Sequence, residues 1–105
     1  MITVQLHTLA HARTGDKGNR ASICLVAYDA NDWQLLVTQV TEARVTELFA
    51  HRNPTAVRRY LLPKLNAMNF VLDDVLEGGV NGALNLDSHG KCLSAWLLTL
   101  PVELN

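Results

Sequence analysis

Apolar and polar residues alternate in several short runs of this sequence, and this pattern limits the fold more than any other. Residues 2–10, 21–28 and 56–62 each follow a two-residue period. Successive side chains of a strand point to opposite faces, so such runs are typical of strands with one buried face. We therefore predict three strands. The apolar residues that carry the pattern are Ile2, Val4 and Leu6, then Ala21, Ile23, Leu25 and Ala27, then Val57 and Leu61.

Helical spacing, in steps of three and four residues, appears in two other segments. The first begins after Asp29-Ala30-Asn31-Asp32 and has Thr41 as a credible N-cap in its middle, so two short helices or one bent helix would fit. Its apolar residues are Trp33, Leu36, Val37, Val40, Val45, Leu48 and Phe49. The second segment follows Pro63, covers 65–76 and meets a stop at Gly78-Gly79, which predicts a helix.

A C-terminal hairpin is predicted from the remaining residues. Its strands would cover 80–86 and 91–100, its turn would be 87–90, and Pro101 would end it. The predicted order is β-β-α-β-α-β-β, which places the sequence in the α+β class. We expect two main helices on one face of a mixed, mainly antiparallel sheet. The other face would then stay exposed, which predicts a homo-oligomer or a permanent partner.

Length and composition favour one globular domain over 1–105. A chain of 105 residues has the common size of a single domain, and 49% hydrophobic with 18% charged residues is ordinary for a globular protein. The net charge of −1 lacks the broad positive field that nucleic-acid binding usually needs, so no nucleic acid is expected as a partner.

The cellular location is expected to be the cytoplasm. Cys24 and Cys92 are isolated in apolar runs, which indicates small buried side chains in a reducing compartment. The N-terminus has no signal-peptide pattern, and no apolar run approaches the ~20 residues that cross a bilayer, so no membrane is expected as a partner.

One polar segment, expected to be a loop at 13–19, is the candidate ligand-binding site. Two glycines could free the backbone to form an anion-binding concavity, and the cations beside them would favour phosphate or carboxylate. The alternative is a strand connection whose charges are only solvated. The candidate ligand-binding residues are Arg13, Thr14, Gly15, Asp16, Lys17, Gly18 and Asn19, with Lys91 if the terminal hairpin lies beside the first strands.

Other chemistry has little support in the sequence. The segment 13–19 matches no nucleotide-binding fingerprint. His7 and His11 would lie about 13 Å apart in one strand, too far for one metal ion, so no metal is expected. No cofactor is expected either. Asp73-Asp74 would diverge on a helix, and no serine has the setting of a nucleophile elbow. Asn66 and Asn69 would cap a loop or line a pocket. No complete catalytic set is visible.

A set of ordered motifs resembles the AtuA-like ferredoxin-fold domain family over nearly the whole chain. The motifs are Arg13-Thr14-Gly15-Asp16-Lys17-Gly18-Asn19, Arg59-Tyr60 with Pro63, Asn69-Phe70-Val71-Leu72, Leu76 with Gly78-Gly79-Val80, and Asp87 with His89-Gly90-Lys91. The resemblance implies a ferredoxin-like sandwich without an iron–sulfur cluster. It also implies either a free-standing small protein or the C-terminal part of an AtuA-type chain linked to acyclic terpene breakdown.

Two functions are expected from these observations. The first is an accessory module, a subunit or partner of an AtuA-type protein in acyclic terpene or branched acyl-CoA catabolism. The second is a small acyl-CoA-binding or anion-binding protein, or an enzyme, whose site forms at a subunit interface around the 13–19 segment and Lys91. Binding of an AtuA-type partner would favour the first, and specific ligand binding by the isolated chain would favour the second.

Overall fold

A computed structural model describes residues 2–17, 20–74 and 91–104 of the chain. Its strands and helices are β1 (Ile2–Gln5), β2 (Ala10–Lys17), β3 (Arg20–Ala27), α1 (Trp33–Gln39), α2 (Glu42–Leu48), β4 (Ala56–Leu62), β5 (Ala67–Asp73), α3 (Lys91–Leu97) and β6 (Pro101–Leu104). Short 3-10 turns at Leu6–Thr8, Ala30–Asp32, Ala50–Arg52 and Pro63–Leu65 connect several of them. None of the helices in these residues is long and apolar enough to span a membrane.

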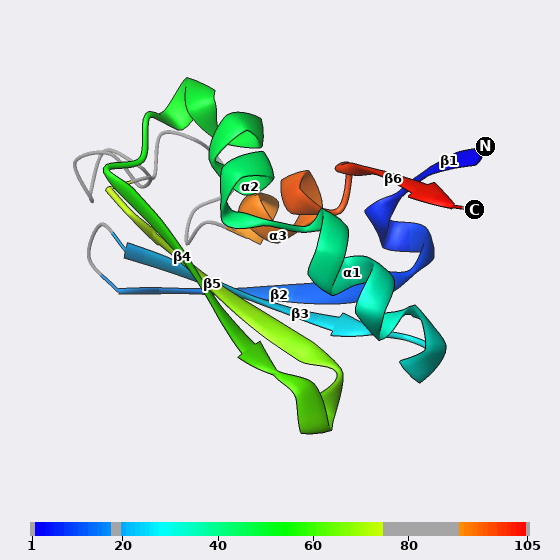
Figure 1. Cartoon of the computed structure of the whole chain (residues 1–105). Coiled ribbons are helices and arrows are strands. Elements are labelled where there is room, and N and C mark those ends of the chain that lie inside the picture. The colour runs from blue at the N-terminus through cyan, green and yellow to red at the C-terminus, as the bar shows by residue number, and fades with distance from the viewer. Residues whose placement is uncertain (1, 18–19, 75–90, 105) are drawn as a thin grey trace.

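The strands form two antiparallel sheets. The larger sheet has the order β2-β3-β5-β4, and the smaller one pairs β1 with β6. Hydrogen bonds from Leu6 N to Leu100 O (2.8 Å) and from His7 N to Leu98 O (3.0 Å) extend the smaller pairing. As a result, the two ends of the chain lie side by side (Figure 1).

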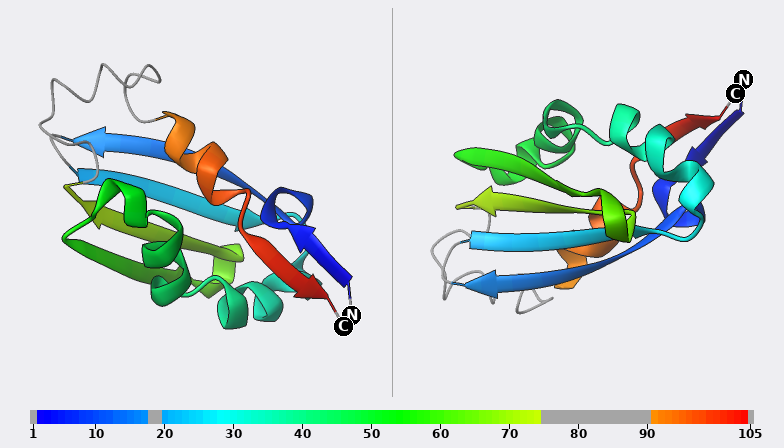
Figure 2. Two further views of the ribbon diagram at one scale, coloured as in Figure 1. Left: turned by 90° about the horizontal axis from the view of Figure 1, so that it is seen from above. Right: turned by 60° about the horizontal axis from the view of Figure 1, so that its bottom comes forward.

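The three helices lie on one face of the four-stranded sheet (Figures 1 and 2). Seen from above, α3 covers β2 and α2 lies over β4. The core lies between these layers and is filled by alternate residues of the central strands, with helix residues packed against them. Its largest fully buried side chains are Phe49, Phe70, Leu6, Ile23, Leu25, Leu36, Met68, Leu72, Leu97, Val40 and Val45. Among the described residues no helix lies on the opposite face of the four-stranded sheet, and we call it the open face.

The predicted α+β class is confirmed, and so are several individual elements. The run 21–28 forms β3, and 56–62 forms β4 with the predicted bounds. The segment 33–49 is two short helices rather than one bent helix. Thr41 separates them and caps α2, because its Oγ1 accepts a hydrogen bond from Arg44 N at 3.2 Å.

The helix predicted at 65–76 is wrong. Pro63–Leu65 is a single 3-10 turn, and Asn66 follows it with a left-handed φ of 52°, which ends any helical course. Residues 67–73 then form β5, where both β3 and β4 satisfy the backbone. Met68, Phe70 and Leu72 alternate into the core, whereas Leu65 is 66% exposed. Asn66 and Asn69 therefore do not share a helix face.

The strand predicted at 91–100 is also wrong. Lys91–Leu97 is α3, which buries Leu93 and Leu97 one helical turn apart. Pro101 does not end the last element but begins β6. The predicted strand at 80–86 and turn at 87–90 lie outside the described residues. At the other end of the chain, the predicted strand 2–10 is interrupted by the turn Leu6–Thr8, so it contributes β1 to one sheet and the start of β2 to the other.

Candidate functional site

The segment expected to be a loop at 13–19 is mostly strand. Arg13 pairs with Cys24 and Gly15 pairs with Ser22, and the ladder continues to Lys17 and Arg20. Ala10 and Ala12 alternate toward the core, and this burial of one face fixes the register of β2 on β3. Gly18 and Asn19 lie outside the described residues.

Gly15 does not use the backbone freedom that favoured an anion-binding loop. It is paired within β2 and has no left-handed φ, and a Cβ built on it would meet no atom within 4 Å. The glycine therefore leaves part of the sheet surface without a side chain, and it does not form a sharp turn. Within the described residues 13–17, an anion would therefore have to be bound by side chains.

The two faces of β2 divide the predicted site. Thr14 lies on the helix-covered side, where its Oγ1 accepts a hydrogen bond from Ser94 N in α3 at 2.9 Å. Arg13 and Gly15 alternate to the open face. Lys91 begins the helix that packs on the covered side, although its side chain, like those of Asp16 and Lys17, lies outside the described residues. Thr14 thus anchors α3 to β2.

Thr14→Val should lower the free energy of unfolding by about 1–2 kcal/mol, because Ser94 N in the first turn of α3 loses this acceptor. A urea titration followed by circular dichroism would measure the change. Thr14→Ser is the matched control, which keeps the oxygen and should lose less than half as much. Equal stability of the valine variant and the wild type would show that the hydrogen bond does not hold α3.

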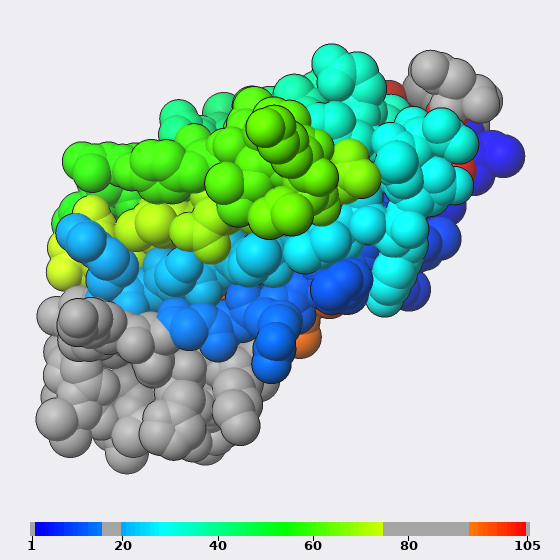
Figure 3. Space-filling model, turned by 90° about the horizontal axis from the view of Figure 1, so that it is seen from below, coloured from blue at the N-terminus to red at the C-terminus, as the bar shows by residue number. Residues whose placement is uncertain are grey.

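Cross-strand rows bring distant polar residues together on the open face. Arg13, Cys24, Asn69 and Tyr60 are aligned across all four strands, and the next row contains Gly15, Ser22, Val71 and Arg58. Ser22 Oγ donates a hydrogen bond to Asn69 Oδ1 at 3.0 Å, which joins the two rows. Figure 3 shows this face, with the four strands side by side. Cys24 is a free thiol and is only partly buried, so the prediction that it is buried is wrong.

The open face carries an excess of positive charge. Arg13 and Arg58 are both exposed, and within the described part of the chain neither forms a hydrogen bond or ion pair. Asp73 is the acidic side chain on this face among the described strand residues, and it is already bound to Arg20, whose Nε lies 2.6 Å from its Oδ1. Two guanidinium groups therefore remain available to an external carboxylate or phosphate.

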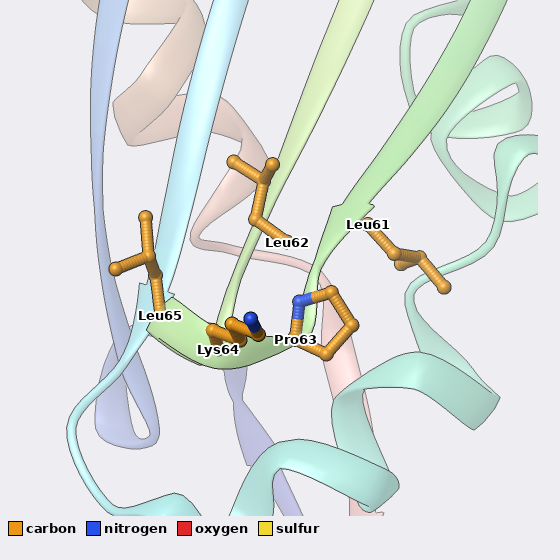
Figure 4. Close-up of a pocket in the computed structure, with 5 residues that line it drawn as sticks. All are labelled: Leu61, Leu62, Pro63, Lys64 and Leu65. Atoms are coloured by element: carbon orange, nitrogen blue, oxygen red, sulfur yellow. The ribbon is translucent and has the colours of Figure 1, made fainter.

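One end of the open face is apolar. The hairpin between β4 and β5 exposes Leu61 (40%), Leu62 (41%) and Leu65 (66%), and Tyr60 is exposed beside them. Residues 61–65 line an open depression of about 580 Å³. In Figure 4 the side chains of Leu62 and Leu65 point to the same side of the hairpin, while Leu61 points to the other. Aliphatic side chains gathered in this way usually mark a contact surface.

Comparison with protein families decides where this chain belongs. The family model of the AtuA ferredoxin-like domain matches residues 4–103. The chain belongs to this family. Comparison with curated proteins and with solved structures finds no match.

Arg59 of the AtuA ferredoxin-like domain has a structural role. It lies on the helix-covered side of β4, where its Nη1 donates hydrogen bonds to Val37 O (2.8 Å) and Val40 O (2.7 Å) at the end of α1. Its backbone N donates to Glu42 Oε2 at 2.7 Å, so a side chain of α2 covers a donor that the edge strand would otherwise leave free. Arg59 therefore joins both helices to the sheet.

The structure assembles residues that the sequence analysis did not group. Arg58, Tyr60, Asn69, Leu62 and Leu65 come from β4, β5 and the turn between them, yet they share the open face with Arg13. The alternation in 56–62 could have placed Arg58, Tyr60 and Leu62 on the opposite strand face from Arg59. Their neighbours on β5 could not be predicted, because residues 65–76 were expected to form a helix. Among the described residues, no three His, Cys, Asp or Glu side chains are close enough to hold a metal ion.

Proposed function

We propose that this AtuA ferredoxin-like domain is an accessory module that binds an AtuA-type protein through the open face of its four-stranded sheet. The observation that carries the proposal is the composition of this face. It combines Arg13 and Arg58, which form no hydrogen bond or ion pair within the described part of the chain, with exposed aliphatic side chains at Leu62 and Leu65. Monomeric proteins seldom expose such a combination over one continuous sheet surface, whereas interfaces use it often.

The biological setting that we propose comes from the family. The chain would serve an AtuA-type protein in acyclic terpene or branched acyl-CoA catabolism in the cytoplasm, and the reacting groups would lie on that larger protein. The role of such a module would be to complete or position the assembly. Thr14 and Arg59 support this reading, because two of the family's motif residues hold helices on the sheet rather than face a ligand.

Complex formation tests the proposal directly. The purified chain would be mixed at tens of micromolar with an AtuA-type protein that lacks its own ferredoxin-like domain, and the mass of the product would be measured by size-exclusion chromatography with light scattering. We expect a stable complex containing both chains. Separate elution of the two proteins would contradict the proposed function, and self-association of the chain alone would point to a homo-oligomer instead.

A second candidate, an acyl-CoA-binding or anion-binding protein, is favoured by one observation. Arg13 and Asn69 lie in one cross-strand row. The hydrogen bond from Ser22 occupies the side-chain oxygen of Asn69, so it does not involve the amide N–H donors of Asn69. Lys17, Asn19 and Lys91 are further candidates for this site. Calorimetric titration with coenzyme A would test it, with Arg13→Ala expected to weaken binding. No heat change with the wild type would exclude this function.

A further inference from the structure

The open face has two chemically different halves. One half contains the donors Arg13, Arg58 and Asn69, with no free carboxylate among the described strand residues. The other half begins two residues further along the strands, in the row of His11, Val26, Ala67 and Leu62, and ends at Leu65. Tyr28 extends this half, where its ring lies 5.4 Å from the ring of His11. A binding partner must match both halves.

The shape of the face favours a polypeptide over a small ligand. Small-molecule sites are concave and bury most of their ligand, whereas the depression at 61–65 is open and lies at one end of a sheet. An exposed sheet surface in which a donor group adjoins aliphatic side chains is instead typical of protein interfaces, where arginine and apolar residues occur together.

Charge argues against a second copy of this chain on the face. In a two-fold contact the same patch meets itself, so the arginines of one copy would face either the arginines or the apolar half of the other, and neither half offers a free carboxylate among the described strand residues. Asp73 cannot compensate, because Arg20 already binds it. Like charges opposed across an interface are costly, so the complementary surface should be acidic.

We propose that the AtuA-type partner places an acidic, aliphatic segment on the open face, with one carboxylate at Arg58, a second at Arg13, and an aliphatic side chain at Leu62 and Leu65. This inference rests on the proposed function and specifies the partner's chemistry. Arg58 and Leu62 lie four residues apart on β4, or about 13 Å along the strand, whereas Arg13 lies on β2 at the opposite edge of the sheet. Residues i and i+4 of an extended segment lying along β4 span this distance, as do residues i and i+8 of a helix, about 12 Å apart along the axis. The segment therefore carries Asp or Glu and an aliphatic residue at one of these spacings.

A synthetic peptide with Glu and Leu at the spacings given above probes this chemistry without the AtuA-type protein. Titration into the ¹⁵N-labelled chain, followed by NMR chemical shifts, should perturb β2, β3, β5 and β4 around Arg13, Asn69 and Leu62. Peptides with Lys in place of Glu, or Ser in place of Leu, should bind at least about tenfold more weakly. Equal binding of the Lys peptide overturns the inference. Equal binding of inorganic phosphate also overturns it and indicates a small-anion site.

Variants test the same point in the complex. Arg13→Glu with Arg58→Glu should weaken binding of the AtuA-type protein by about tenfold or more, and Leu65→Asp should do likewise. Ile2→Asp is a matched control, since Ile2 is 64% exposed but belongs to the other sheet, and it should leave affinity unchanged. A complex that persists in the Arg and Leu65 variants overturns this inference and the open face as the binding surface, but leaves the accessory role of the module standing. Absence of any wild-type complex overturns the proposed function with it.

Discussion

Phe70→Ala should lower the free energy of unfolding by about 3–5 kcal/mol. Phe70 is fully buried in β5, where Ile23 and Arg59 are its neighbours on the adjoining strands. Removing its ring loses the burial of the apolar surface and leaves a cavity beneath the helices. A domain of this size is stable by only ~5–15 kcal/mol, so part of the population could unfold at room temperature.

Val71→Ala is the matched control for Phe70. Val71 is adjacent in sequence but alternates to the open face, where it is only partly buried, so its loss should be within about 1.5 kcal/mol. The urea midpoints of the two variants would show whether Phe70 and Val71 lie on differently buried faces of β5. Losses of similar size at the two positions would contradict the strand and its single buried face.

Arg59→Met should lower the free energy of unfolding by about 2–3 kcal/mol. Methionine keeps most of the aliphatic stem but removes the guanidinium that binds Val37 O and Val40 O, and hydrogen bonds from charged groups contribute more than neutral ones. Thermal denaturation followed by circular dichroism would measure the loss.

Arg58→Met is the corresponding control on the open face. Arg58 forms no hydrogen bond or ion pair with the described residues, so its loss should change stability by less than about 0.5 kcal/mol. If the two variants were equally stable, Arg59 would not hold α1 and α2 on the sheet. If only Arg58→Met were destabilised, the assignment of the two faces of β4 would be reversed.

The sequence was sufficient to predict the α+β class and the parts with one clear period. In β3, alternating Ala21, Ile23 and Leu25 fit only a strand, and the spacing of Val45, Leu48 and Phe49 after the Thr41 cap fits only a helix. Both predictions are confirmed because local pattern and tertiary packing favour the same structure there.

The two wrong secondary-structure predictions, at 65–76 and 91–100, fall where the same apolar residues fit both a helical and a strand period. Residues four apart share a face in a helix and also in a strand, so Met68 and Leu72 fit both, as do Leu93 and Leu97. Neighbouring elements decide between the alternatives. The pairing of β5 with β3 and β4 and the Thr14 contact with α3 are long-range, and local spacing contains no information about them.

The candidate site was only partly predictable for the same reason. Arg13 was identified from its polar neighbours, but the segment was expected to be a loop because Gly15 suggested a turn. Arg58, Asn69 and Leu65 join Arg13 on one surface only after β4 and β5 pair in register, which places residues more than forty positions apart in neighbouring rows. Whether the predicted residues bind a ligand stays a prediction.

Alkylation of Cys24 tests most directly whether the open face is the binding surface. Cys24 lies in the row of Arg13 and Asn69 and is partly exposed, so a partner seated there must cover its thiol. In a Cys92→Ala background, the rate of Cys24 modification by N-ethylmaleimide would be measured with and without a saturating AtuA-type protein. We predict that the complex slows the reaction about tenfold or more, as the free fraction falls. An unchanged rate in a complex verified by light scattering would contradict binding through the open face.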